Sequence, residues 1–174
     1  MVRLLQNLWN CHNLNDWRKH LSETEKSARK IAEDLLERSG RGLLTGDFGL
    51  FADCFALPTE METFDGRRII KTLAELEAAF DAVRAYFGTT GMTRMERHIV
   101  DAEFRNPTSI FSTHQSCLAA EDVLVQQPFD VLSVIALIDG RWRIRHSQYA
   151  ITDSHAHKMA LIGGDTKPDD RIGD

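Results

Sequence analysis

The chain has 174 residues, of which 43% are apolar and 27% are charged, which is enough for one domain with a sizeable core. Its formal net charge of -5 argues against a nucleic-acid-binding protein, because phosphate recognition needs a concentrated basic surface. No apolar run approaches the roughly 20 residues that span a bilayer, and three cysteines without CxxC spacing are typical of a reduced protein, so we expect a cytoplasmic protein that does not bind membranes.

The first part of the chain predicts an arm followed by two helices. Residues 1–21 carry scattered leucines and tryptophans, and we expect them to form an arm that packs on the domain or acts as a lid over a pocket. The capping box Ser22–Glu25 begins a helix that we expect to continue through the small residues at positions 39–42 and to end at Thr45. Those small residues would let the helix lie close against a sheet. Asp47 can then cap a second, short helix.

A small hairpin and a third helix are predicted next. Asp65-Gly66 favours a tight turn between Glu60–Thr63 and Arg67–Lys71. The residues Thr72–Glu75 form a second capping box, which begins a helix that reaches about Phe87.

Two long strands follow at about residues 93–105 and 109–120, joined by a turn at Asn106-Pro107. Side chains alternate along a strand, and one face of the first strand is apolar enough to point inward. That face comprises Glu96, His98, Val100, Ala102 and Phe104. With an even-numbered turn, the inward side chains of the second strand are Phe111, Thr113, Gln115 and Cys117. His114 is then expected to point outward.

The stretch Phe129–Ile151 predicts a long hairpin, because Asp139-Gly140 between apolar runs favours a two-residue type I′ turn. Such a turn fixes the register, and directly opposed residues share a face. The face expected to look inward comprises Val131, Ser133, Ile135, Leu137, Trp142, Ile144, His146 and Gln148. The other face is too apolar to stay exposed, and it comprises Leu132, Val134, Ala136 and Ile138 beside Arg141, Arg143 and Arg145. The polar, glycine-bearing residues 152–174 are expected to form a flexible tail.

The order of these elements resembles a known superfamily. The residues that carry the resemblance are Leu43–Phe48 with Leu50–Ala52 and Phe55, Met61–Gly66, Arg97-His98 and Asp139–Ile144. They resemble the nuclear-transport-factor-two-like superfamily, and within it the SnoaL-like (polyketide cyclase type) branch, over about residues 25–151. The resemblance implies an α+β, cystatin-like fold over residues 22–151, in which a strongly curved mixed or antiparallel sheet forms a cone-shaped barrel around the helices. It also implies a pocket at the open end and dimerisation through the outer sheet face.

The superfamily includes isomerases, dehydratases, cyclases and proteins that only bind or assemble, so the fold does not give the function. The chain resembles ketosteroid isomerase in architecture but not in its chemical residues. Thr63 stands near the place of that enzyme's general-base aspartate, and Ser39 stands near the place of its oxyanion-hole tyrosine. Both substitutions argue against that activity.

The inward polar side chains form the candidate site. Burial disfavours the imidazolium cation, and a neutral histidine in an apolar pocket can accept a proton at pH 7. We therefore expect His98 to act as a base, and His146 as its acid partner or as a hydrogen-bond donor. The expected ligand-binding residues are Thr113, Gln115, Ser133, Trp142 and Gln148. The alternative is that both histidines are structural core residues.

No cofactor or metal is indicated by the sequence. His155-x-His157 supplies only two metal ligands, and Cys117 has no sequence neighbour that would activate a thiolate.

Two functional hypotheses stay open. The first is a homodimer that binds a small apolar, carbonyl-bearing molecule and acts on it as an isomerase, dehydratase or cyclase by histidine-mediated proton transfer. The second is a non-catalytic ligand-binding or assembly module with a vestigial pocket.

Overall fold

The computed structural model describes residues 23–163, so the predicted arm, the Ser22 capping interaction and the last part of the predicted tail lie outside the described residues. The helices are α2 (Glu23–Thr45), α3 (Phe48–Ala52), α4 (Leu73–Thr90) and α5 (His155–Ile162). The strands are β1 (Phe55–Thr63), β2 (Gly66–Ile70), β3 (Arg94–Asn106), β4 (Ser109–Ala120), β5 (Val123–Leu124), β6 (Phe129–Ile138) and β7 (Arg141–Tyr149). None of the helices in this range is long and apolar enough to cross a membrane.

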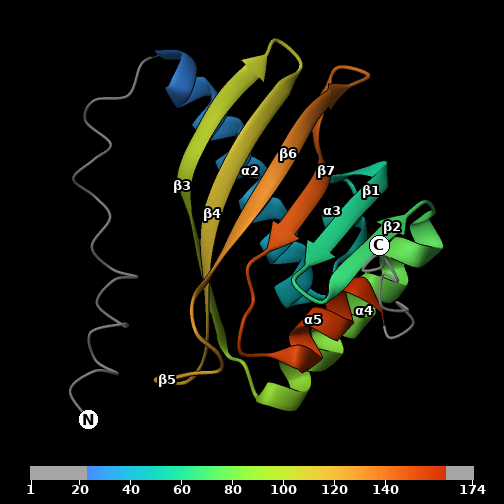
Figure 1. Ribbon diagram of the computed structural model, residues 1–174, viewed down its shortest axis with the longest axis vertical. Coiled ribbons are helices and arrows are strands. Elements are labelled where there is room, and N and C mark those ends of the chain that lie inside the picture. Colours follow the sequence, from blue (N-terminus) through green and yellow to red (C-terminus); the bar gives the residue numbers. More distant parts are fainter. Residues whose placement is uncertain (1–22, 164–174) are drawn as a thin grey trace, which may run out of the picture.

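One curved sheet contains the seven described strands in the order β2-β1-β7-β6-β4-β3, with β5 paired to β4. β1 and β7 pair in parallel, and the other described pairs are antiparallel. α2 packs against β3, while α5 packs against α4 and β1. Figure 1 shows the long strands curving over α2, with α4 and α5 together beside β1 and β2. This is the predicted α+β architecture, a mixed sheet bent around helices.

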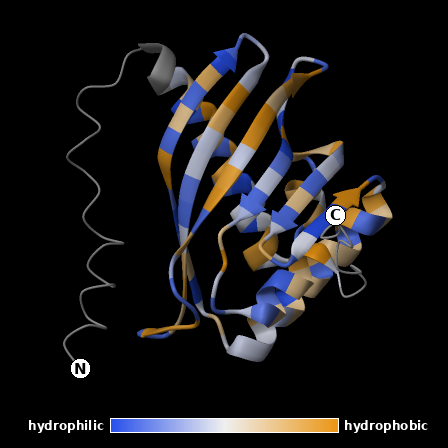
Figure 2. Ribbon diagram, in the orientation of Figure 1, coloured by the Kyte–Doolittle hydropathy of each residue, from blue (hydrophilic) through white to orange (hydrophobic). Residues whose placement is uncertain are grey.

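The core lies between the concave face of the sheet and the helices. Its fully buried side chains come from both layers: Leu35, Ile70, Leu76, Ile110, Leu118, Val131 and Ile151. The ring of Phe51 on α3 packs against the rings of Phe55 and Phe80, with centroids 4.7 and 5.0 Å apart. Figure 2 shows that β6 is hydrophobic along most of its length, beside the more mixed β4. Apart from Asp130, the outward side chains of β6 are apolar, as are most of its inward ones.

The local start and stop signals of the helices act as predicted. α2 continues through its interior glycines and ends before Gly46, whose φ of 77° suits glycine. Asp47 caps α3 by accepting a hydrogen bond from the Leu50 amide at 2.9 Å. The capping box of α4 is complete, because Thr72 accepts from the Glu75 amide while the Glu75 carboxylate accepts from the Thr72 amide.

Two glycines let α2 approach its neighbours closely. A β-carbon at Gly42 would lie 2.8 Å from the Asp47 carbonyl oxygen and 2.8 Å from the Phe51 nitrogen, so α3 could not pack as it does. A β-carbon at Gly40 would collide with the guanidinium group of Arg97 on β3. The small residues predicted to allow close packing therefore serve two neighbours, α3 and the sheet.

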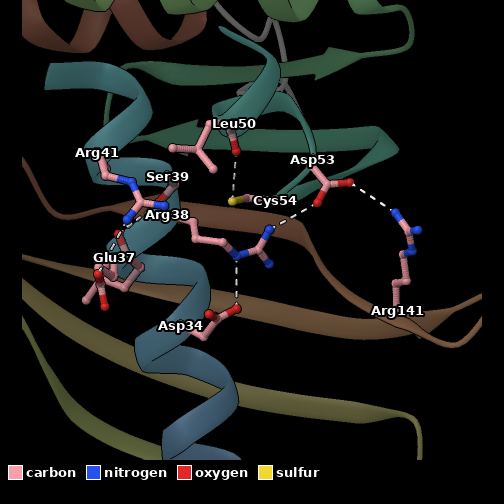
Figure 3. A network of polar contacts seen from close by, with 10 residues as sticks. Asp34, Glu37, Arg38, Ser39, Arg41, Leu50, Asp53, Cys54 and Arg141 are labelled. Carbon is pink, nitrogen blue, oxygen red and sulfur yellow. Dashed lines mark hydrogen bonds and ion pairs between the residues drawn. The ribbon is translucent and has the colours of Figure 1, made fainter. Parts of the chain in front are cut away.

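A polar network connects the helices to the final hairpin (Figure 3). Arg38 on α2 donates to Asp34 at 2.9 Å and to Asp53, after α3, at 3.0 Å. Asp53 also faces two arginines of β7, Arg141 at 3.5 Å and Arg143 at 3.6 Å. Two of the three arginines predicted on this strand therefore have a carboxylate partner within the chain.

One extra residue in β7 changes the predicted faces of the final hairpin. The Asp139-Gly140 turn has the predicted left-handed φ angles, 50° and 74°, and the first pairs follow the predicted register. Further along, His146 lies opposite Val134, so Arg145 is a bulge. A one-residue bulge reverses which of the following side chains face the core.

β3 and β4 show the same effect. Val100 is skipped in the pairing of β3 with β4, and so is Arg105 next to the turn. Because of the shift at Arg105, the turn does not act as an even-numbered one. His114 consequently faces the core, and Thr113 faces outward.

The segment after Ile151 differs from the predicted flexible tail, because residues 155–162 form α5. The Ser154 hydroxyl caps this helix by accepting from the His157 amide at 3.3 Å. Leu161 and Ile162 are buried in the core. The helix is only eight residues long, which is too short for a clear amphipathic period in the sequence.

Candidate functional site

A cavity of about 80 Å³ lies between the helices and the concave face of the sheet. A cavity of this size has room for several water molecules or a small organic molecule. Its walls are mostly apolar and come from α2, α3, α4 and the sheet: Leu36, Phe51, Phe55, Val83, Phe87, Leu118 and Ile144. Polar side chains interrupt these walls: Ser39, Arg97, His114, Ser116, Ser133, Ser147, Tyr149 and His157.

Arg97 brings a positive charge into this apolar surrounding. Its Nη2 donates to the carbonyl oxygen of Leu36 on α2 and lies 3.5 Å from the Ser39 hydroxyl. Burial lowers the pKa of Arg97 to about 10, an effect that Tyr149 and Cys54 partly oppose, so the guanidinium stays charged at pH 7. Among the described residues, Arg97 forms no ion pair with a carboxylate.

His114 lies near the middle of β4 and lines the same cavity. Burial, together with the nearby Arg97 and His98, lowers the pKa of His114 to about 3. The ring is therefore neutral at pH 7. Within residues 23–163 the imidazole has no hydrogen-bond partner, so its nitrogens are available to a molecule in the cavity.

Ser133 on β6, with Ser147 and Tyr149 at the C-terminal end of β7, completes the polar lining. The hydroxyls of Ser133 and Ser147 lie 3.5 Å apart. Burial raises the pKa of Tyr149, against the opposing effects of Ser147 and Arg97, so the phenol is neutral at pH 7. These groups can donate or accept hydrogen bonds without adding a negative charge.

α5 closes one end of the cavity through His157. Its Nδ1 lies 2.9 Å from Gln126 Oε1, which also accepts from the Tyr86 hydroxyl at 2.7 Å. The rings of Tyr86 and His157 are stacked, with centroids 4.6 Å apart. Burial lowers the pKa of His157 to about 4, although Asp153 opposes the shift. Because Gln126 Oε1 can only accept, His157 is held as the neutral tautomer with its proton on Nδ1.

Among known proteins, only solved structures are similar to this chain. No family model matches the chain, and no curated protein matches its sequence. A protein of unknown function from Nostoc punctiforme, described as having a cystatin-like fold, is 19% identical with a TM-score of 0.58, covering 78% of this chain and 96% of its own. An NTF-2 like protein of unknown function from Shewanella oneidensis is 11% identical with a TM-score of 0.56, covering 70% and 97%.

This chain has the cystatin-like fold that these solved structures share. A ketosteroid isomerase-like protein from Erwinia carotovora shares the architecture, at 10% identity and a TM-score of 0.52 over 72% of this chain and 97% of its own. Likeness at such identities shows the fold alone. The assignment to the SnoaL-like branch stays a prediction.

Within this cystatin-like fold, most of the predicted site residues are not in the cavity. The side chains expected inside but found on the outer face of the sheet are His98, Thr113, Gln115, His146 and Gln148. Gln115 donates to the exposed Asp130 at 3.3 Å, and His146 Nε2 lies 3.3 Å from Glu62 Oε2. The skipped residues in β3 and β7 are the physical reason, because each one reverses the alternation on which the prediction rested.

Two further predicted residues do face inward. Ser133 lines the cavity as expected. Trp142 packs on the concave side against Phe104, with ring centroids 5.7 Å apart, but near the Asp139-Gly140 turn and outside the cavity. The inward set that sequence reasoning missed is Arg97, His114, Ser116, Ser147, Tyr149 and His157.

The outer face holds a group that could ligate a metal ion. Ligand atoms of Glu60, Glu62 and His146 lie within 4.8 Å of one another, since the parallel pairing of β1 with β7 places these residues side by side. All three side chains are partly exposed, and Glu60 also lies 3.6 Å from Arg67. This group does not belong to the cavity, and nothing else around it indicates a bound ion.

Acidification is expected to weaken folding through His157. Its pKa is about 4 in the folded chain against an ordinary value of 6.5, so between these pH values the unfolded chain binds a proton that the folded chain does not. The stability that this group contributes is therefore present above pH 6.5 and lost as the pH falls towards 4. In urea unfolding at pH 7 and pH 4, the wild type should lose about 3 kcal/mol more than His157→Gln. An equal loss in both proteins would contradict the buried, neutral state of His157.

Proposed function

We propose that the chain binds a small molecule in the cavity, and that any proton transfer on that ligand goes through His114. The observation that supports this proposal is a neutral imidazole without a hydrogen-bond partner among the described residues, facing a mostly apolar cavity. Ligand sites in proteins commonly combine apolar walls with a few convergent polar groups. The lining here has that composition.

The low basicity of His114 favours ligand binding over proton transfer as its role. An imidazole with a pKa of about 3 is a weak base, so it is better suited to hydrogen-bond a ligand than to remove a proton from carbon. Arg97 is positioned to stabilise negative charge that develops on a ligand oxygen. A cofactor-independent isomerase, dehydratase or cyclase acting on a carbonyl compound is the catalytic form of the proposal. A ligand carrier without turnover is the alternative.

Filling the cavity should abolish ligand binding. Ser133→Leu adds apolar volume inside the cavity, while Thr113→Leu makes a comparable change on the outer face of the same sheet. With 4-methyl-2-pentanone as the probe, ligand-observed NMR titration should show at least tenfold weaker binding in Ser133→Leu and little change in Thr113→Leu. Circular dichroism melting confirms that both variants fold. Binding that survives in a folded Ser133→Leu protein would place the ligand elsewhere.

The catalytic form makes a separate prediction. The wild type should accelerate exchange of the α-protons of the same ketone in D₂O, and His114→Gln should reduce that acceleration at least tenfold. His98→Gln is the matched control, because His98 lies on the neighbouring strand but on the outer face. Exchange rates measured by proton NMR distinguish a protein that catalyses proton transfer from a ligand carrier. Binding without accelerated exchange in the wild type would leave the carrier alternative and exclude proton transfer.

The outer sheet face supports a proposal of homodimerisation. Leu132 on β6 is 38% exposed, and Val134, Ala136 and Ile138 extend the same apolar face. A second copy of the chain would bury this face against itself in a two-fold arrangement.

Charge on that face should separate the dimer. Leu132→Glu is expected to convert a dimer into a monomer in light scattering coupled to size exclusion. Leu73→Glu introduces the same change at an exposed leucine of α4 and should leave the mass unchanged. A wild-type mass equal to one chain would sink the dimer proposal.

A further inference from the structure

We propose that the ligand of the cavity is a small apolar anion, whose carboxylate or equivalent oxyanion is bound by Arg97. This inference rests on the proposed ligand-binding role of the cavity and adds the chemical class of the ligand. It starts from a charge that the described part of the chain leaves without a counter-charge.

Arg97 is partly buried, since it lines both the cavity and an open groove beside α2, and its hydrogen-bond partners among the described residues are all neutral. Its contacts are the carbonyl oxygen of Leu36 and the hydroxyl of Ser39. Tyr149 and Cys54, the other groups that affect the pKa of Arg97, are both neutral at pH 7 because burial raises their own pKa values. A partly buried cation loses part of its hydration, and an opposite charge on a ligand would compensate that loss. A guanidinium has five N–H donors, so these neutral contacts leave donors for a ligand.

The remaining lining of the cavity favours an anion over a cation. No aspartate or glutamate is among the residues that line it. Both histidines there are neutral at pH 7. His114 can donate a hydrogen bond to an anion, whereas His157 already donates its Nδ1 proton to Gln126. Four serine hydroxyls, those of Ser39, Ser116, Ser133 and Ser147, also line the cavity. An anionic head group would thus be surrounded by donors and one positive charge.

The apolar walls indicate that the ligand is apolar outside its anionic group. Aromatic and aliphatic side chains from the helices and the sheet surround the polar patch, and the volume of about 80 Å³ limits the ligand to a small body. A short branched or aromatic carboxylate satisfies both conditions. A neutral ketone of the same shape would gain the apolar contacts but leave the charge of Arg97 uncompensated. Charge-assisted hydrogen bonds are roughly twice as strong as neutral ones, so the difference should be measurable.

Gly40 supports the proposed role of Arg97 in anion binding. A side chain at this position would collide with the Arg97 guanidinium, so the glycine lets the cation reach between α2 and the sheet. The bulge at Val100 is equally required, because it places Arg97 on the concave face together with Ala102. Two separate features therefore bring this one charged group to the cavity.

The test compares two ligands of nearly equal shape, 3-methylbutanoate and 4-methyl-2-pentanone, by NMR titration at pH 7. The wild type should bind the carboxylate at least tenfold more tightly than the ketone. Arg97→Met should weaken carboxylate binding at least tenfold and change ketone binding less than threefold. Arg94→Met removes an arginine from the same strand whose side chain is 42% exposed, and it should keep the wild-type preference.

Each outcome has a defined meaning. Equal binding of both ligands to the wild type would overturn the anion proposal while the ligand-binding function stands. Binding of neither ligand would sink the function itself, and with it this inference. If Arg97→Met fails to fold, Gly40→Ala displaces the guanidinium without removing it and should lower the carboxylate preference. An unchanged preference in a folded Gly40→Ala protein would also count against the role of Arg97.

Discussion

The pairing register of the long strands determines the chemistry of the interior. One extra residue in β3 and one in β7, Val100 and Arg145, change the alternation of side chains without breaking the sheet. As a result Arg97, Ser147 and Tyr149 line the concave side. The helices can cover this polar group only because α2 lies close to β3, where a glycine faces the guanidinium. The cavity is thus a product of register and close helix packing together.

The lining of the cavity carries a single charged side chain at pH 7. Burial keeps His114, Tyr149 and His157 in their neutral forms at pH 7, while Arg97 remains charged. A small apolar space with one cation and several neutral donors selects ligands by charge as well as by shape. α5 belongs to this arrangement, because His157 and Leu161 line the cavity and a hydrogen-bonded glutamine fixes the helix to α4.

Local chemistry made most of the fold predictable. The Thr72 capping box, the Asp47 cap and the Asp139-Gly140 turn each depend on a few adjacent residues, so they are visible in the sequence. The candidate site was not predictable in the same way. A bulge depends on how two distant strands meet, and neither Val100 nor Arg145 carries a local signal for it. The inward position of Ser133 was predicted correctly, because the extra residue of its hairpin lies in β7 and the alternation along β6 is undisturbed.

The bulge at Arg145 also bears on how distant relatives should be aligned. Arg145 has no partner on β6, and the residues on either side of it are paired. Removing Arg145 would therefore leave Ser147 opposite Ser133. A relative that lacks the bulge can therefore keep the same interior while being one residue shorter in this strand. An alignment that forbids gaps inside strands would match its interior positions with exterior ones here. At identities of 10–19%, a single-residue gap at position 145 decides whether equivalent side chains are compared at all.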